Sequence, residues 1–479
     1  MSGVSEPEAQ TAMKHESAER RRFSWRSRRG LVIVVAVAVA VVLAAAAVVA
    51  FGVIRGSQRP ASDPVAVTVP VPIGGVEVPA DTKIGVIVTT GTGNAEGADW
   101  SSAAEGAVVA RERLALGGSE IQLVVENDKG TTAGAHEAAT ALVEQGVAGI
   151  VYASSGEQLD AGIAVATEHK VGVVLPFAEA PASSVNVWSL APTESDVQVQ
   201  FSQALEAYER PLHLDAGPGL PDGVRVPDVL QHRTGSDIKS LAMQVAEMTG
   251  SDPLAHGGYA GGSDDDEQDE ADAETVPEQR VDAIVLSGPA ALQANITREL
   301  QARNVTAPIF LTPGATSQRF EDTLIENGAA VSSALRTFGY DWDDAVALGN
   351  DGRGRTGSAF LAAIRVFSAD SEILNLTEDS PFAEVSGAAD GRAHDALLAL
   401  ARAVSDAGST DPTKVATALA GLTLVAGDAI TGPEMDFATS QAVAAPTVTL
   451  YATGQQLGLR PESGADADAL VWFAEPAAR

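Results

Sequence analysis

Four short apolar runs set the fold that we predict for this chain: KIGVIV at 83–88, IQLVVE at 121–126, VAGIVY at 147–152 and VGVVLP at 171–176. Each run is rich in valine and isoleucine and has the length of a β-strand that is buried on both faces. A helical stretch separates each run from the next. In one such stretch a single apolar stripe is formed by Ala135, Ala138, Ala139, Leu142 and Val143. This alternation predicts a parallel sheet covered by helices on both faces.

The same alternation returns in the second half of the chain. VDAIVLSG at 281–288 and APIFLT at 307–312 are predicted strands, and the segment 289–304 between them is a predicted helix. The segment RAHDALLALARAVSDAG at 392–408 has one apolar face, which predicts a late helix. The fold class that follows is α/β.

A low-complexity acidic segment, GGYAGGSDDDEQDEADAETVPEQ at 257–279, interrupts the pattern. It has too few apolar residues to form a core, so we predict a solvated disordered loop. A calcium site is the alternative, but the carboxylates lack the spaced D-x-D-x-D-G pattern. The chain has no cysteine and its seven histidines are scattered singly, so neither a metal site nor a cofactor is predicted.

An uncharged stretch near the N-terminus, residues 31–54, is long enough to cross a hydrocarbon layer of ~30 Å as a helix. Six arginines precede it within residues 1–30, whereas only Arg55 and Arg59 follow closely. The positive-inside rule places the basic tail in the cytoplasm and the main domain outside, so we expect a single-pass protein of the cell membrane. A cleaved signal peptide is the alternative, but its apolar region usually runs ~7–15 residues.

The charge of the chain limits its partners. The 479 residues carry a formal net charge of −33, and 45% are apolar, which is enough for a sizeable core. Because residues 1–30 are net positive, the remainder is more acidic than the whole. An acidic domain repels phosphate backbones, so we expect no nucleic-acid partner.

Polar residues that directly follow predicted strands are candidate site residues, because ligands of open α/β sheets bind at the carboxyl ends of strands. In YASSGEQ at 152–158, Ser154 and Ser155 present hydroxyl and N–H groups at a helix start. Two interpretations stay open: the serines bind an anion such as a carboxylate, or they only cap the helix. A serine nucleophile is not indicated, because the G-x-S-x-G pattern is not matched.

Two further strand ends supply candidates. Phe177, Ala178 and Glu179 follow VGVV, and a carboxylate there either holds a ligand ammonium or lies in solvent. Trp100 ends the glycine-rich loop after KIGVIV; this loop is one residue off the dinucleotide fingerprint, so nucleotide binding is not predicted. Trp100 and Tyr340, which both follow strand ends, are the better aromatic candidates for ligand contact.

The ordered set of segments resembles the branched-chain amino-acid type of periplasmic substrate-binding proteins. The resemblance covers roughly residues 82–452, from KIGVIV through YASSG and LPFAEAP to ITGPEMDF. It implies two doubly wound α/β lobes joined by three crossovers, with a ligand in the cleft between them. The expected segments are a Pro-rich stalk at 55–81, a first lobe at 82–195 and 308–428, a second lobe at 196–307 and 429–456, and a C-terminal tail at 457–479.

The resemblance also implies roles for single residues. Ser155 corresponds to the hydroxyl that holds a ligand carboxylate, Ser154 is its neighbour, and Phe177 to Glu179 form the loop that meets both ends of the ligand. Two positions depart from the family: Glu179 stands where a threonine is frequent, and Thr234 stands where a ligand-facing tyrosine is frequent. A desolvated Glu179 facing a carboxylate is unfavourable. We therefore expect a cationic or neutral polar solute rather than a free α-amino acid.

The predicted function is that of a membrane-anchored extracytoplasmic solute-binding protein, not an enzyme. It captures a small polar solute (amino-acid-like, amide or cationic) between two lobes for an ABC-type importer. The expected partners are the permease of that importer and the lipid bilayer, which residues 31–54 enter. The alternative is a non-transporting sensor or interaction module that regulates cell-envelope proteins. The anchor, the arginine-rich tail and the acidic insertion favour this alternative. No base–nucleophile pair or metal set in the sequence indicates catalysis.

Overall fold

The computed structural model describes residues 71–91, 95, 97–182, 184–217, 219–233, 235–251, 280–326, 328, 331–332, 334–454, 460 and 470–474. By its contacts the chain divides into residues 1–68 and 69–479, and every described residue belongs to the second unit. The predicted basic tail, membrane helix and acidic insertion therefore lie outside the described residues. Within the described ranges, no helix combines the length and the apolarity needed to cross a membrane.

The first sheet is built from the four apolar runs that open the domain, plus one short strand. Its order is β2-β1-β3-β4-β5, and every pairing is parallel. The strands are β1 (Lys83–Val88), β2 (Gln122–Asn127), β3 (Gly149–Ala153), β4 (Gly172–Leu175) and β5 (Val187–Ser189). The parallel sheet predicted from strand–helix alternation is thus confirmed.

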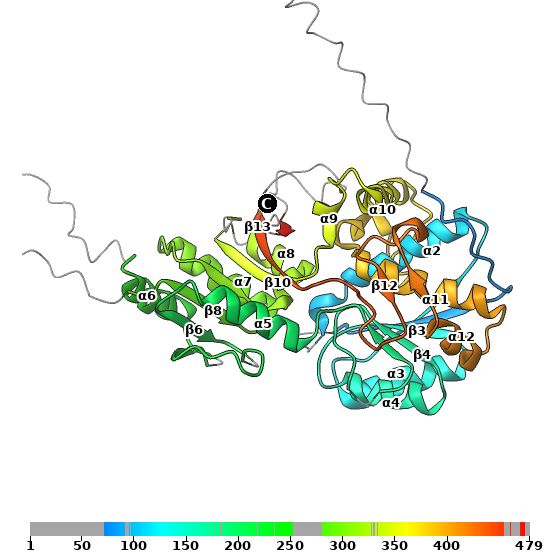
Figure 1. Cartoon of the computed structure of the whole chain (residues 1–479), viewed down its shortest axis with the longest axis horizontal. Coiled ribbons are helices and arrows are strands. Elements are labelled where there is room, and N and C mark those ends of the chain that lie inside the picture. Colours follow the sequence, from blue (N-terminus) through cyan, green and yellow to red (C-terminus); the bar gives the residue numbers. More distant parts are fainter. Residues whose placement is uncertain are drawn as a thin grey trace, which may run out of the picture. The chain divides into compact units, whose positions relative to one another are not determined.

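Helices cover both faces of this sheet (Figure 1). Along β1, Val86 and Val88 pack into one core, whereas Ile87 points to the other, because successive side chains of a strand alternate between faces. The Ile87 side is covered by α3 (Thr132–Glu144) and α4 (Leu159–Glu168). The opposite side is covered by α2 (Gly106–Leu116), α10 (Gly352–Ser368), α11 (Gly391–Ala407) and α12 (Pro412–Leu419).

The second sheet has the order β14-β13-β10-β9-β8-β6-β7. The pairs from β7 to β10 are parallel, and β13 and β14 are added antiparallel at one edge. Its strands are β6 (Pro211–Asp215), β7 (Asp228–Gln231), β8 (Ala283–Ser287), β9 (Ile309–Leu311), β10 (Leu335–Gly339), β13 (Val448–Thr453) and β14 (Val471–Ala474). One face packs on α6 (Ile238–Thr249), α7 (Ala290–Ala302) and α8 (Gln318–Glu326), and the other on α5 (Glu194–Leu205).

The chain passes between the two sheets three times, as the resemblance implied. It leaves the first sheet after β5, returns after β10 through the short α9 (Asp343–Val346), and re-enters the second sheet at β13. Before that last passage, the small hairpin of β11 (Thr423–Leu424) and β12 (Met435–Asp436) packs on the first core.

Three predicted lobe boundaries are wrong. β9 and β10 pair with β8 in the second sheet, so the chain returns to the first lobe near residue 340 and not at 308. Met435 and Phe437 lie in the first core, so the second lobe does not resume at 429. The expected C-terminal tail at 457–479 contains β14, which pairs with β13. An apolar run predicts a strand, but its composition does not predict which of the two sheets the strand joins.

The end of the predicted stalk is also part of the first lobe. Ile73 and Val76 are buried in the first core. The backbone N–H of Ile73 donates to the carbonyl of Arg113 at 2.9 Å, and the Arg113 Nε donates to the carbonyl of Val71 at 2.8 Å. Residues 71–77 are therefore fixed on α2 rather than extended in solvent, because Ile73 and Val76 enter the first core and Val71 packs against it.

Candidate functional site: a cavity at the strand ends

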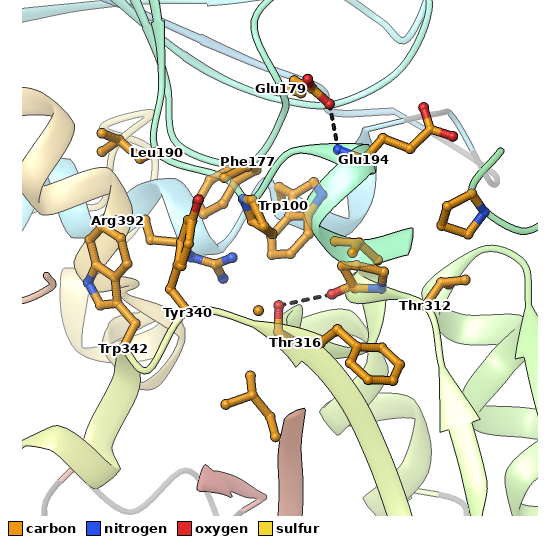
Figure 2. Close-up of a pocket in the computed structure, with 18 of the residues that line it drawn as sticks. Trp100, Phe177, Glu179, Leu190, Glu194, Thr312, Thr316, Tyr340, Trp342 and Arg392 are labelled. Carbon is orange, nitrogen blue, oxygen red and sulfur yellow. Dashed lines mark hydrogen bonds between the residues drawn. The ribbon is translucent and has the colours of Figure 1, made fainter. Parts of the chain in front are cut away.

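A cavity of about 440 Å³ lies at the carboxyl ends of strands from both sheets (Figure 2). Loops after β1 and β4 line it from the first sheet, and loops after β8, β9 and β10 line it from the second. The passages between the sheets contribute Leu190 and Trp342. The volume suits a small organic ligand, and this position is where open α/β sheets place their ligands.

An aromatic pair forms the wall on the side of the first sheet. Trp100, in the short helical turn Ala98–Trp100, stacks on Phe177 with ring centroids 4.6 Å apart and planes 6° from parallel. The guanidinium carbon of Arg392 lies 4.8 Å from each ring centroid, and Figure 2 shows the side chain of Arg392 reaching toward the pair. All three residues line the cavity, so it has an aromatic wall with a cation beside it.

Arg392 is held by the residue that begins its helix. The carboxylate of Asp390 accepts from the Arg392 Nη2 at 2.6 Å and from its Nε at 3.0 Å, and it also accepts from the Arg392 backbone N–H at 2.7 Å. Asp390 is thus the N-cap of α11 and the counter-ion of the arginine at once. This geometry fixes the guanidinium against the aromatic rings and balances its charge.

The second sheet supplies hydroxyl groups and further rings. Thr312, Thr316 and Phe338 line the cavity, and the side-chain amide of Gln293 bonds both the backbone N–H (3.1 Å) and the hydroxyl (2.8 Å) of Thr312. The Tyr340 hydroxyl accepts from the Gln441 amide at 2.9 Å. Burial raises the pKa of Tyr340 to about 12, so its hydroxyl stays protonated at neutral pH.

Two carboxylates line the exposed part of the cavity. Glu179 Oε2 accepts from the backbone N–H of Glu194 at 2.7 Å, and Glu194 Oε1 accepts from the backbone N–H of Asp222 at 2.9 Å. Glu179 therefore occupies the N-terminus of α5, where a negative charge is favourable. In the same way Asp99 accepts from the backbone N–H of Ala290 at 3.1 Å, at the start of α7.

The structure is similar to solved structures of binding proteins, at low sequence identity. The branched-chain amino acid transporter substrate-binding protein LivJ of Streptococcus pneumoniae, solved with isoleucine, is 16% identical over 82% of this chain and 100% of that chain, with a TM-score of 0.55. A type 1 periplasmic binding protein of Bordetella pertussis is 15% identical, with the same coverage and a TM-score of 0.52. The chain has the type I periplasmic-binding fold.

Another structure with this fold is an ABC transporter solute-binding protein of R. palustris, solved with 4-hydroxybenzoate. It is 14% identical over 82% of this chain and 97% of that chain, with a TM-score of 0.53. A scan against family models and a search of curated sequences found no match. The resemblance inferred from sequence is confirmed as a likeness of fold, and the names of these neighbours describe solute binding rather than catalysis.

Within the type I periplasmic-binding fold, three of the predicted site residues line the cavity: Trp100, Phe177 and Glu179. Ala178 does not, because its side chain packs on the α3–α4 core and its carbonyl accepts from the Ser189 hydroxyl at 2.7 Å. Thr234 lies outside the described residues.

Ser154 and Ser155 are not among the residues that line this cavity, which therefore gives no support to the anion-binding interpretation of YASSGEQ, and the capping interpretation is wrong. The Ser154 hydroxyl is fully buried and bonds Thr89 at 2.6 Å and Gln158 at 3.3 Å. Neither serine caps α4; its N-cap is Gln158, whose side chain makes no capping bond. Gly97, with φ at 91°, lies against both residues: a side chain at this glycine would collide with the Ser154 hydroxyl and the Ser155 carbonyl, and Ser155 itself is half-buried.

Sequence reasoning missed Arg392 altogether. It lies at the start of a helix and not after a strand, so the rule that selected the other candidates does not select it. The Asp390–Gly391 pair before the apolar helical pattern was a helix-start signal that marked the position. Tyr340, one of the two better aromatic candidates from the sequence, lines the cavity, as does Trp342. Among the described residues, no group of three or more His, Asp or Glu side chains is placed to hold a metal ion.

Proposed function

We propose that the protein is an extracytoplasmic solute-binding protein, tethered to the cell membrane by residues 31–54, that captures a small organic solute for an ABC-type importer. The observation that carries this proposal is the cavity of about 440 Å³, lined from both sheets and from the passages between them. A solute in this position contacts two lobes that three passages of the chain connect, so its binding energy favours their approach.

Contacts across the cavity support a closing motion. Asp99 belongs to the loop after β1 of the first sheet and accepts from the start of α7, which packs on the second sheet. Gln441 donates to the Tyr340 hydroxyl at 2.9 Å and to the Ala191 carbonyl at 2.9 Å, so it ties two of the passages together. In a closed, solute-bound form such hydrogen bonds should be short, and in an open form they should be longer or broken.

Calorimetry of the full chain in mild detergent tests the proposal. The titrants are a panel of amino acids, amides, amines, polyamines and aromatic acids. We expect at least one to bind with a dissociation constant of about 1 mM or tighter. Trp100→Leu removes a cavity wall and weakens that binding by about tenfold or more. Trp472→Leu is the matched control, because Trp472 is equally buried but does not line the cavity. Silence of the whole panel contradicts the proposal.

A second candidate function, a membrane-tethered sensor of the same solute, is favoured by a buried polar chain in the first lobe. Arg113 Nη1 bonds His394 Nε2 at 2.9 Å, and His394 Nδ1 bonds Asp395 at 2.8 Å. Asp395 accepts from the Thr431 backbone and hydroxyl, and the Thr431 hydroxyl accepts from Trp342 Nε1 at 3.0 Å. Trp342 lines the cavity.

The first member of this chain contacts the segment nearest the proposed tether, because Arg113 also binds the carbonyl of Val71. Hydrogen bonds therefore connect residue 71 to the cavity wall without a flexible joint. A shuttle gains from a flexible tether, whereas a sensor needs such a rigid connection. Co-purification from membranes distinguishes the two: an importer's permease and ATPase support the first function, and an envelope synthase or kinase supports the second.

A further inference from the structure

The groups around the cavity that commonly bind an anion are already paired within the protein. The Arg392 guanidinium bonds Asp390 at 2.6 Å. The N-terminus of α5 is occupied by Glu179 at 2.7 Å, and that of α7 by Asp99 at 3.1 Å. Arginines and helix N-termini are the usual partners of a ligand carboxylate. A ligand carboxylate at any of these three places must therefore compete with a carboxylate of the protein.

The negative groups of the cavity, Glu179 and Glu194, accept backbone N–H groups but have no cationic side chain as a partner in the described part of the chain. Among the described residues, neither Glu179 nor Glu194 forms an ion pair with a lysine, arginine or histidine. Both line the cavity on its exposed part. Burial is the main cause of the raised pKa of Tyr340, and the negative charges of Asp196 and Glu179 raise it further. Within the described ranges, the charges at the cavity that no side chain of opposite charge neutralises are therefore the two carboxylates.

The walls of the cavity are unusually aromatic. Aromatic residues make up 5% of the chain, yet five of the 21 residues that line the cavity are aromatic. They are Trp100, Phe177, Phe338, Tyr340 and Trp342. Such rings bury the flat or apolar body of a ligand, and their faces attract a cation by ~0.5–2 kcal/mol. Aliphatic amino acids and polyamines lack a ring, so they make weaker contacts with these walls than an aromatic ligand does.

From these three observations we infer that the cavity selects an organic cation with a flat, apolar body and discriminates against carboxylates. The ammonium group lies toward Glu179 and Glu194, and the body lies against the aromatic walls. This inference rests on the proposed solute-binding function and names the class of its solute. A free amino acid should bind less tightly on the same ground, because its carboxylate meets only groups that the protein already pairs.

The test compares four ligands that share a phenyl ring and a short chain. They are 2-phenylethylamine, 3-phenylpropanoate, the neutral 3-phenylpropanamide and phenylalanine, each titrated into the full chain by calorimetry. We expect the amine to bind at least about tenfold more tightly than the carboxylate and than phenylalanine, with the amide between them. The affinity for the amine should fall as salt rises, and the affinity for the amide should not, because screening acts only on the charged ligand.

Variants identify the groups responsible. Glu179→Gln keeps an oxygen for the N–H of Glu194 but removes the charge, and we expect it to weaken amine binding by about threefold to tenfold. The double variant Glu179→Gln/Glu194→Gln should bring amine and amide within about threefold of each other. Glu157→Gln is the matched control: Glu157 is exposed on the loop after β3 and does not line the cavity, so amine binding should not change.

The outcomes separate this inference from the function on which it rests. Carboxylate binding as tight as amine binding overturns the inference and leaves solute binding intact. Amine binding that is insensitive to salt and to both Gln substitutions overturns it as well. Silence of all four ligands, together with silence of the wider panel, overturns both proposals. The salt titration uses the unmodified chain, so the result does not depend on the variants folding.

Discussion

The loops after β3 and β4 follow neighbouring strands of one sheet, yet the first is part of the buried interior and the second borders the cavity. After β3, the Ser154 hydroxyl is fully buried and bonds Thr89 and Gln158. After β4, Phe177 and Glu179 face the cavity. A polar strand end is therefore a candidate site only when no other segment buries it: Gly97 lies against Ser154, whereas Phe177 and Glu179 border the cavity.

The polar groups beneath the first loop form one connected cluster. The buried Asp128 accepts from the Thr89 hydroxyl at 2.6 Å, the Tyr152 hydroxyl at 3.0 Å and the Gly130 N–H at 2.9 Å. Thr89 in turn bonds Ser154. We therefore expect substitutions in this cluster to lower the stability of the protein, and substitutions in the cavity wall to lower its affinity for a ligand. The four predictions that follow test this division.

The largest effect is expected for Asp128→Ala. It leaves two buried hydroxyls without their acceptor, so the free energy of unfolding should fall by about 3–5 kcal/mol. Denaturant unfolding measures this change. Asp128→Asn keeps one oxygen and should cost less, and Asp160→Ala, at an exposed carboxylate of α4, should cost less than about 0.5 kcal/mol. A loss below about 1 kcal/mol for Asp128→Ala contradicts the assignment of this cluster to the interior.

The next effect concerns the pH dependence set by Glu105, another buried carboxyl of the first lobe. Burial raises its pKa from 4.5 to about 7, and both oxygens accept from the Leu376 N–H, at 3.0 and 3.1 Å. The folded chain thus keeps the proton up to about pH 7, whereas the unfolded chain releases it near 4.5. Stability therefore falls as pH rises through this window, by up to about 3 kcal/mol.

Glu105→Gln removes this titration and keeps an acceptor for Leu376. The variant should gain stability relative to the original chain on going from about pH 5 to about pH 8, and the difference should vanish at the acidic end. Denaturant unfolding at both pH values measures it. An equal difference at the two values shows that the proton on Glu105 plays no part in the stability of the first lobe.

On the cavity side, Phe177→Leu keeps apolar volume but removes the ring that stacks on Trp100. We expect the affinity for 2-phenylethylamine to fall by about threefold to tenfold, because an aromatic contact is worth ~0.5–1.5 kcal/mol beyond its area. Stability should fall by about 1 kcal/mol or less. Calorimetry and unfolding together separate the two effects. A large loss of stability with unchanged affinity would show that Phe177 supports the core and does not contact the ligand.

The smallest effect is expected for Ser155→Ala. The resemblance implied that this hydroxyl holds a ligand carboxylate, and its loss would then weaken binding by ~1–3 kcal/mol. Because Ser155 does not line the cavity, we expect the affinity to change by less than about twofold. Calorimetry with the same amine, and with 3-phenylpropanoate, decides between the two. A tenfold loss of affinity for either ligand contradicts the conclusion that the loop after β3 takes no part in binding.

Much of the fold was predictable because strands and helices carry local patterns. The apolar runs at 83–88, 121–126, 147–152 and 171–176 became four parallel strands, and the stripe from Ala135 to Val143 became α3. Sheet membership was less predictable: β9, β10 and β14 joined the second sheet against expectation, since a buried strand has the same composition in either lobe.

By itself, the sequence determined the α/β class, the acidic charge, the absence of cysteine and the aromatic and carboxylate side chains after β1 and β4. Only the tertiary structure decided which of these groups meet. It buried Ser154 under Gly97, brought Arg392 to the ring of Trp100 almost 300 positions earlier in the chain, and placed the Glu179 carboxylate at the N-terminus of α5. Periodicity records how a segment buries its own face, whereas contacts between distant segments follow from the packing of the whole chain.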